Sequence, residues 1–191
     1  KAPWAEADWR KESLRRMTLL AKMAEDAGIV LVHENCSGWG GQGPRQTLDL
    51  LSEVRSEALK LVFDTGNPAQ YGQDAWEYYE PVRDHVAYVH IKDYRVGADG
   101  KEAAVFAGDG GCHVRRILTD LFARGYDGGF SIEPHITSVI HLRQEASDPA
   151  LSYRTYVEYG RRFERLVAEI RPGDAGPGRT GSGDARPTGS R

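Results

Sequence analysis

The sequence has few cysteines, no long apolar run and no strong excess of charge of either sign. Two cysteines in 191 residues are too few for a disulfide framework, so we expect free thiols and a cytoplasmic protein. No apolar run reaches the length of a membrane-spanning helix or resembles a secretory signal, and we therefore expect no membrane partner. A net charge of −3 provides no basic surface for nucleic acid.

Short apolar segments alternate with amphipathic helical segments along most of the chain. The expected strands are 29–34, 59–64, 86–92 and 129–133, and the expected helices lie at 8–26, from 44, at 74–84, from 114 and at 149–170. This alternation is typical of parallel βαβ units. The predicted fold class is therefore α/β.

The number of strands is too small for a complete (β/α)8 TIM barrel, which typically needs about 250 residues. We count four parallel strands, or five if 104–107 is included. We therefore predict a partial (β/α)8 barrel over residues 1–171, with four to five parallel strands, outer helices and the N-terminal strands missing. A complete open sheet of five strands is the alternative.

Two other segments carry local signals. Residues 94–108 contain the turn sequence Gly-Ala-Asp-Gly at 97–100, which favours a small hairpin or excursion. Residues 172–191 are rich in Gly, Pro and Ser and have little to bury, so we expect a disordered tail.

Each of the four expected strands carries a side chain capable of binding metal at or near its carboxyl end: Glu34, Asp64, His90 and Glu133. Ligand sites of parallel α/β sheets and barrels lie at that end. Because alternate residues of a strand share a face, all four side chains can point inward together. We predict that they converge on one point. The alternative is that they are unrelated polar residues at strand ends.

Three carboxylates and one imidazole suit a hard-to-borderline divalent cation. Mn²⁺ is the expected ion, with Mg²⁺, Co²⁺ and Zn²⁺ as alternatives. Without a cation the three carboxylates would repel one another, and some would have to protonate. The composition of the predicted cluster therefore favours a metal centre.

Five motifs follow one another in a specific order. They are His-Glu-Asn at 33–35, Phe-Asp-Thr-Gly-Asn-Pro at 63–68, Val-His-Ile-Lys-Asp at 89–93, Gly-Asp-Gly-Gly at 108–111 and Gly-Tyr-Asp-Gly-Gly-Phe-Ser-Ile-Glu-Pro at 125–134. The ordered set resembles the xylose isomerase-like TIM barrel superfamily, and most of all its sugar phosphate isomerase/epimerase branch. The resemblance covers about residues 8–170 and starts at the family's fourth strand.

The resemblance implies a divalent metal held by Glu34, Asp64, His90 and Glu133. It also implies that Glu34 and Glu133 are the catalytic acid and base on opposite sides of a carbohydrate substrate. A metal chelated by a carbonyl and an adjacent hydroxyl acidifies the C–H bond between them, so one glutamate removes the proton and the other returns it. We predict a sugar, polyol or ketose isomerase or epimerase, with dehydratase chemistry left open.

The chain departs from the family at several positions. Asn67 stands where many members have a histidine, so it is expected to bind a substrate hydroxyl without moving a proton. Asp109 stands where relatives often have glutamate. No cluster of phosphate-binding residues is visible, so the substrate need not be phosphorylated.

Three further residues are candidate substrate contacts. Trp39 offers an apolar wall for a sugar ring, unless it packs on its own loop. Lys92 is expected either to neutralise an oxyanion or to form a salt bridge with Asp93 or Asp109, and His135 to reach the rim of the site.

Two alternatives to a sugar isomerase or epimerase are a DNA hydrolase and an inactive barrel fragment. The superfamily contains apurinic endonucleases that act on DNA, but these need additional histidines, and none lies between Asp93 and Gly111. The other alternative is an inactive barrel fragment. An open sheet edge is a liability that a partner can cover, so a homo-oligomer is also expected.

Overall fold

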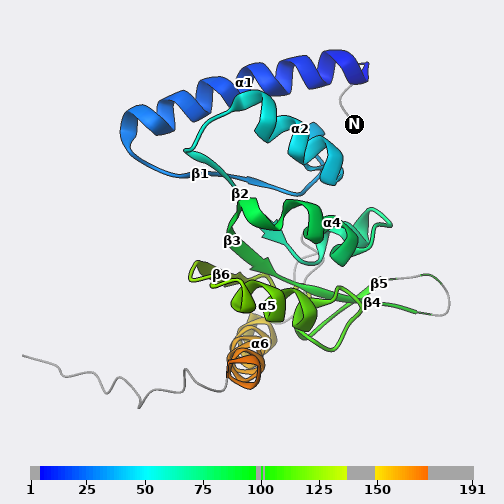
Figure 1. Cartoon of the computed structure of the whole chain (residues 1–191). Coiled ribbons are helices and arrows are strands. Elements are labelled where there is room, and N and C mark those ends of the chain that lie inside the picture. The colour runs from blue at the N-terminus through cyan, green and yellow to red at the C-terminus, as the bar shows by residue number, and fades with distance from the viewer. Residues whose placement is uncertain (1–4, 98–99, 101, 137–148, 172–191) are drawn as a thin grey trace, which may run out of the picture.

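The computed structural model describes residues 5–97, 100, 102–136 and 149–171. Its centre is a parallel sheet in the order β1-β2-β3-β6, so neighbouring strands follow one another along the chain (Figure 1). The strands are β1 (Leu31–Glu34), β2 (Leu59–Asp64), β3 (Val86–Ile91) and β6 (Gly129–Ile132). The sequence therefore placed all four strands correctly to within two residues.

Helices connect the strands. They are α1 (Glu6–Ala27), η1 (Trp39–Gly41), α2 (Pro44–Val54), α3 (Asn67–Gln70), α4 (Ala75–Val82), η2 (Arg83–His85), α5 (Val114–Ala123) and α6 (Pro149–Ile170). The residues that end α1 and begin α2 have clear local causes. Gly28 stops α1 by adopting a left-handed conformation with φ 66°, and Pro44 begins α2 at a position where its missing N–H costs nothing.

The two faces of the sheet differ in burial because the helices cover one of them. On β3, Val89 and Ile91 are fully buried in the main hydrophobic core, together with Leu118 of α5 and Tyr79 of α4. The opposite face is more open, and Val32 of β1 is 39% exposed. This is the arrangement of a barrel wall, with helices outside and an inner face that carries polar side chains.

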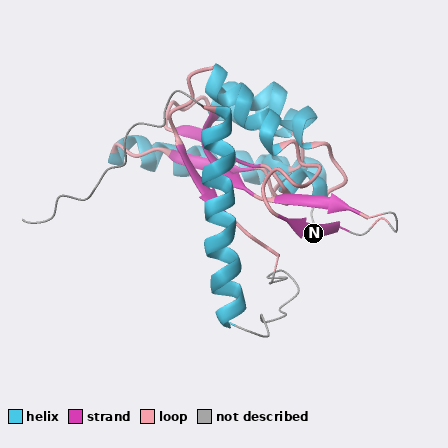
Figure 2. Cartoon of the chain, turned by 90° about the horizontal axis from the view of Figure 1, so that it is seen from below, coloured by secondary structure: helices cyan, strands magenta, loops and turns pink. Residues whose placement is uncertain are grey.

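The expected hairpin is present, and it corrects the count of parallel strands. β4 (Asp93–Val96) and β5 (Glu102–Val105) pair antiparallel in a separate two-stranded sheet (Figure 2). A parallel neighbour requires a crossover of a dozen or more residues, whereas only 97–101 separates these two strands. The prediction of a fifth parallel strand was therefore wrong, and so was the alternative of an open five-stranded sheet among the described residues.

The absence of N-terminal strands stays a prediction, and the expected tail at 172–191 lies outside the described residues. Across the described part of the chain, no helix has the length and apolarity needed to span a membrane.

Asp74 caps the N-terminus of α4. The Asp74 carboxylate accepts hydrogen bonds from the backbone N–H groups of Trp76 and Glu77, at 2.8 and 3.0 Å, and it also contacts His113. Replacing Asp74 by alanine should lower the free energy of unfolding by about 1 kcal/mol, because two helix N–H groups lose their acceptor. Urea denaturation measures this change. Glu80→Ala, at an exposed position of the same helix, is the matched control, and an equal loss in both variants would contradict the capping role.

Candidate metal centre

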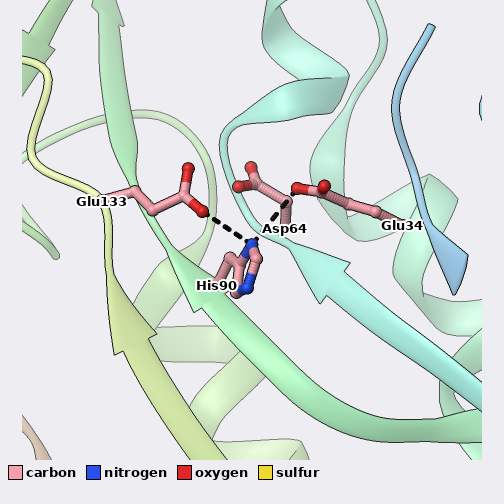
Figure 3. A group of neighbouring side chains, drawn as sticks. All are labelled: Glu34, Asp64, His90 and Glu133. Atoms are coloured by element: carbon pink, nitrogen blue, oxygen red, sulfur yellow. Dashed lines mark hydrogen bonds and ion pairs between the residues drawn. The ribbon is translucent and has the colours of Figure 1, made fainter. Parts of the chain in front are cut away.

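The structure brings Glu34, Asp64, His90 and Glu133 together at the carboxyl end of the sheet (Figure 3). Each offers one ligand atom, and these four atoms lie within 4.8 Å of one another. Glu34 ends β1, Asp64 ends β2, and His90 lies one residue before the end of β3. Glu133 directly follows β6. The four side chains therefore point to the same face of the sheet, as strand alternation predicted.

His90 lies between two of the carboxylates. Its Nδ1 atom is 2.7 Å from Glu133 Oε1 and 3.2 Å from Glu34 Oε1. Hydrogen bonds to Glu133 and then to Glu34 raise the pKa of His90 to about 10, and the bond from His90 is the main reason that the pKa of Glu133 falls to about 2. A single ring nitrogen thus has two carboxylate neighbours but carries at most one hydrogen.

Asp64 is the most buried member of the cluster, with no exposed surface. Its Oδ1 atom accepts hydrogen bonds from the backbone N–H groups of Gly66 and Asn67, at 2.8 and 2.7 Å. Burial raises the pKa of Asp64 to about 6, although the nearby Lys92 ammonium opposes this shift. The second oxygen, Oδ2, points toward Lys92 Nζ at 3.0 Å. Two backbone donors therefore fix this carboxylate in one orientation.

Lys92 and Asn67 lie next to the cluster, and each is only 4% exposed. Lys92 Nζ pairs with Asp64 Oδ2 and with Glu133 Oε2, so the expected salt bridge to Asp93 or Asp109 was wrong. Because alternate residues share a face, the Lys92 side chain lies on the same face as that of His90, whereas the Asp93 side chain lies on the other. This places the ammonium against the metal-ligand candidates.

Asn67 forms three side-chain hydrogen bonds within the protein. Its Nδ2 donates to Glu34 Oε1 at 3.3 Å and to the carbonyl of Asn35 at 3.0 Å, while Oδ1 accepts from Lys92 Nζ at 3.2 Å. Its amide nitrogen therefore has two partners and its amide oxygen one, and the expectation that it binds a substrate hydroxyl stays a prediction. Asn67 links Glu34 to Lys92.

The remaining predicted contacts, Trp39 and His135, each contact a residue outside the cluster, and the place of His135 at the rim of the site stays a prediction. Trp39 is only 3% exposed and packs with Arg10 over its ring at 5.6 Å from the ring centre, so its role as a wall for a sugar ring was wrong. It became buried because α1 covers the loop after β1. His135 is half-buried and its Nδ1 lies 2.9 Å from the Tyr94 hydroxyl, which places it beside the hairpin.

Two residues that sequence reasoning left without a role extend the strand pairing toward the site. The Asn35 side chain bonds both the backbone N–H and the carbonyl of Asp64, at 2.6 and 2.9 Å. The Thr65 hydroxyl donates to the Lys92 carbonyl at 2.7 Å and accepts from the Lys92 N–H at 3.0 Å. Both residues stand in the recognised motifs directly after a metal-ligand candidate, and that position was the only signal for their role.

A third residue of this kind is Asp93, which is only 2% exposed. Its Oδ1 accepts from the N–H groups of Tyr94 and Cys112, at 2.9 and 3.0 Å. Its Oδ2 accepts from those of Gly108 and Gly110, at 2.9 and 3.0 Å. A Cβ on Gly110 would collide with this carboxylate, which explains the glycine there. Asp93 therefore ties the 108–112 loop to the end of β3.

A groove of about 700 Å³ opens near the carboxyl ends of β1 and β2. It is lined by Trp9, Cys36, Ser37, Gly38, Gln42, Gln46, Tyr71 and Gln73. These residues carry amide, hydroxyl and aromatic groups, and no Lys or Arg is found among the described residues that line it. Such a lining can hydrogen-bond neutral polar molecules but supplies no cation for a phosphate.

The residues present fit a divalent cation. The donor set is three carboxylates and one imidazole, which suits Mn²⁺, Mg²⁺, Co²⁺ or Zn²⁺. Asp64 Oδ2 is buried and accepts no hydrogen bond of regular geometry from the described residues. Glu34 shares one histidine nitrogen with Glu133. A cation at this point would therefore meet acceptor oxygens that the protein itself satisfies only in part.

Comparison with known proteins adds a family match. The model of the xylose isomerase-like TIM barrel family matches residues 2–159. Inosose dehydratase from Geobacillus thermodenitrificans (strain NG80-2) is 27% identical over 128 residues, covering 60% of this chain and 43% of the relative. The 2-epi-5-epi-valiolone 7-phosphate 2-epimerase from Actinoplanes sp. (strain ATCC 31044 / CBS 674.73 / SE50/110) is 39% identical over 100 residues, covering 52% and 34%.

A solved structure shares the fold at low sequence identity. The crystal structure of the IOLI protein with a bound zinc atom has a TM-score of 0.64 and 16% identity, covering 89% of this chain and 59% of that one. The chain spans less than half the length of the two relatives above. The family model nevertheless covers most of the chain, and the order of the parallel strands agrees with it. The chain belongs to the xylose isomerase-like TIM barrel family.

Proposed function

We propose that this chain carries the metal centre of a divalent-metal-dependent enzyme that isomerises, epimerises or dehydrates a sugar or a sugar-like polyol or ketose. The observation that supports this most directly is the convergence of Glu34, Asp64, His90 and Glu133 within 4.8 Å. Mn²⁺ is our first candidate for the ion. The zinc atom in the structure of the IOLI protein supports a divalent cation in this fold.

Glu34 and Glu133 are proposed to transfer protons as well as to hold the ion. Their side chains remain about one-third exposed, at 34% and 32%, while Asp64 is fully buried. Only a group that reaches substrate can take a proton from it, so the two glutamates are better placed than the aspartate. A divalent ion held here would polarise a carbonyl group and acidify the C–H bond beside it.

Removal of that proton is a first step common to several reactions. Returning it to the opposite face of the same carbon gives epimerisation, and returning it to the neighbouring carbon gives isomerisation. If the hydroxyl group on the neighbouring carbon leaves instead, and takes up a proton to form water, the result is dehydration. The relatives named above are an inosose dehydratase and an epimerase, which supports this range of reactions.

The substrate is proposed to be a neutral carbohydrate or polyol that enters along the groove near β1. The lining of Gln42, Gln46, Gln73 and Tyr71 offers donors and acceptors for hydroxyl groups, while no cation is available there for a phosphate among the described residues. The absence of a phosphate-binding cluster from the sequence agrees with this proposal.

Metal binding by the isolated chain tests the proposed centre. After treatment with a chelator, the protein should take up one equivalent of Mn²⁺, measured by calorimetry and elemental analysis. His90→Ala should weaken binding by about 10²-fold or more, because it removes one of four ligands and the hydrogen-bond partner of two others. His85→Ala, at the opposite end of the sheet, should bind like the parent. A parent protein that takes up no divalent ion would refute the metal centre.

A further inference from the structure

Lys92 is a buried cation inside the candidate metal centre. Its Nζ atom lies 2.8 Å from Glu133 Oε2, 3.0 Å from Asp64 Oδ2 and 3.2 Å from Asn67 Oδ1. The side chain is 5% exposed, and lysine is almost never so deeply buried unless it is paired. The structure therefore keeps a positive charge within direct reach of two proposed ligands.

The surroundings of Lys92 hold its stem in place. A Cβ on Gly66 would collide with the Cγ atom of Lys92 and would lie 2.9 Å from the Tyr94 ring, so only glycine leaves room for the lysine stem at this point. Thr65 bonds both backbone polar groups of Lys92. Contacts to the backbone and to the aliphatic stem of Lys92 therefore hold its ammonium group in one position.

We propose that Lys92 is a resident counter-cation: it holds Asp64 and Glu133 together when no metal is bound and competes with a divalent ion for these two carboxylates. This inference rests on the proposed function, because it assigns Lys92 a role at the same centre. Lys92 would act as a positioning residue through the two ligands. It would set how tightly the centre binds its ion.

The charge balance explains why such a cation is needed. Glu34, Asp64 and Glu133 bring three negative charges together, and His90 can balance only one of them. The Lys92 ammonium lies at ion-pair distance from Asp64 Oδ2 and Glu133 Oε2, at 3.0 and 2.8 Å, so it supplies the second positive charge. Without Lys92, the metal-free carboxylates would have to move apart or take up protons.

The same charge has the opposite effect on a divalent ion. An ammonium close to two ligands repels a second cation, and part of its pairing must be given up when the ion binds. Lys92 would therefore keep the two carboxylates together before an ion binds, and it would lower the affinity for that ion. Asn67 connects this arrangement to Glu34, since one amide contacts both Lys92 and that glutamate.

The test compares Lys92→Met, which keeps the stem but removes the charge, with Lys60→Met as the matched control. Lys60 lies on β2 and pairs only with the exposed Glu57 among its described contacts. In metal-free buffer, Lys92→Met should lower the thermal midpoint by about 5–15 °C, as expected for breaking a buried ion pair in a chain of this size. Its dissociation constant for Mn²⁺ should fall by at least about tenfold. Lys60→Met should change neither the thermal midpoint nor the dissociation constant for Mn²⁺ by these amounts.

Tighter metal binding in a less stable variant is a result that a purely structural lysine would not produce. Equal or weaker Mn²⁺ binding by a folded Lys92→Met would overturn the inference. If Lys92→Met folds only when Mn²⁺ is present, the ion replaces the ammonium and the inference is supported. If both Lys92→Met and Lys92→Gln stay unfolded at saturating Mn²⁺, the inference is overturned.

The proposed function can fail separately. A parent protein that binds no Mn²⁺ would refute the proposed metal centre. The thermal midpoints of Lys92→Met and Lys60→Met in metal-free buffer would then be the test of the counter-cation role. In that case a midpoint for Lys92→Met no lower than that of Lys60→Met would overturn it.

Discussion

Replacing Glu133 by glutamine should slow exchange of the substrate α-proton with solvent deuterium by about 10²–10⁴-fold, because general base catalysis contributes a factor of that size. Glutamine has nearly the same shape and keeps one oxygen as a ligand, but it is not a base. The carboxylate of Glu133 contacts both His90 Nδ1 and Lys92 Nζ, so metal binding should weaken without being abolished. The comparison is therefore made at saturating Mn²⁺, in protein that contains the complete active site.

Two variants separate proton transfer from metal binding. Glu34→Gln should behave like Glu133→Gln if both glutamates move protons. His90→Ala should instead lose metal first, and excess Mn²⁺ should restore part of the exchange. Glu158→Gln, at a half-exposed position of α6 outside the cluster, is the control for a glutamate-to-glutamine change. Exchange by Glu133→Gln as fast as by the parent would place the base elsewhere.

Replacing Asp93 by asparagine should lower the free energy of unfolding by about 3 kcal/mol or more. The buried carboxylate accepts four backbone hydrogen bonds, two on each oxygen, and bonds to a charged acceptor contribute about 1.5–3 kcal/mol each. An asparagine amide would turn its NH₂ group toward two N–H donors and leave them unsatisfied. Urea denaturation measures the loss.

The same change should also loosen the 108–112 loop before the rest of the chain unfolds. Hydrogen exchange at the amides of Gly108, Gly110 and Cys112 should become faster in Asp93→Asn, because these groups lose their acceptor. Asp109→Asn is the matched control, since that side chain lies in the same loop and is 53% exposed. We expect it to change stability by less than about 0.5 kcal/mol. Similar losses in both variants would contradict the role of Asp93.

The hairpin and Trp39 show where sequence reasoning reached its limit. The turn at 97–100 predicts a hairpin, yet the apolar run at 104–107 also resembles a short parallel strand, which the short connection excludes because it permits only an antiparallel return. Trp39 follows Glu34 by five residues and was expected in the site. Its ring instead lies under Arg10 of α1, a residue that precedes it in the chain by 29 positions. Local spacing contains no information about such a contact.

The sequence by itself determined the elements and the identity of the converging side chains. Apolar strands that alternate with amphipathic helices predict parallel units, and strand alternation allows Glu34, Asp64, His90 and Glu133 to share one face at one end of the sheet. Both deductions use periods of two and about 3.6 residues, which are local properties of the backbone. The structure confirms the strands and brings the four side chains together.

Only the tertiary structure decided which partners surround those four side chains. Lys92 contacts Asp64 and Glu133, which are 28 and 41 positions away in the chain, and Asn67 contacts Glu34 across 33 positions. Asp93 likewise meets Gly108 and Cys112, which are distant in sequence. Such contacts depend on the register between strands and on the path of the loops after them. No periodicity within a segment encodes that geometry, so the counter-cation at the centre became visible only in the folded chain.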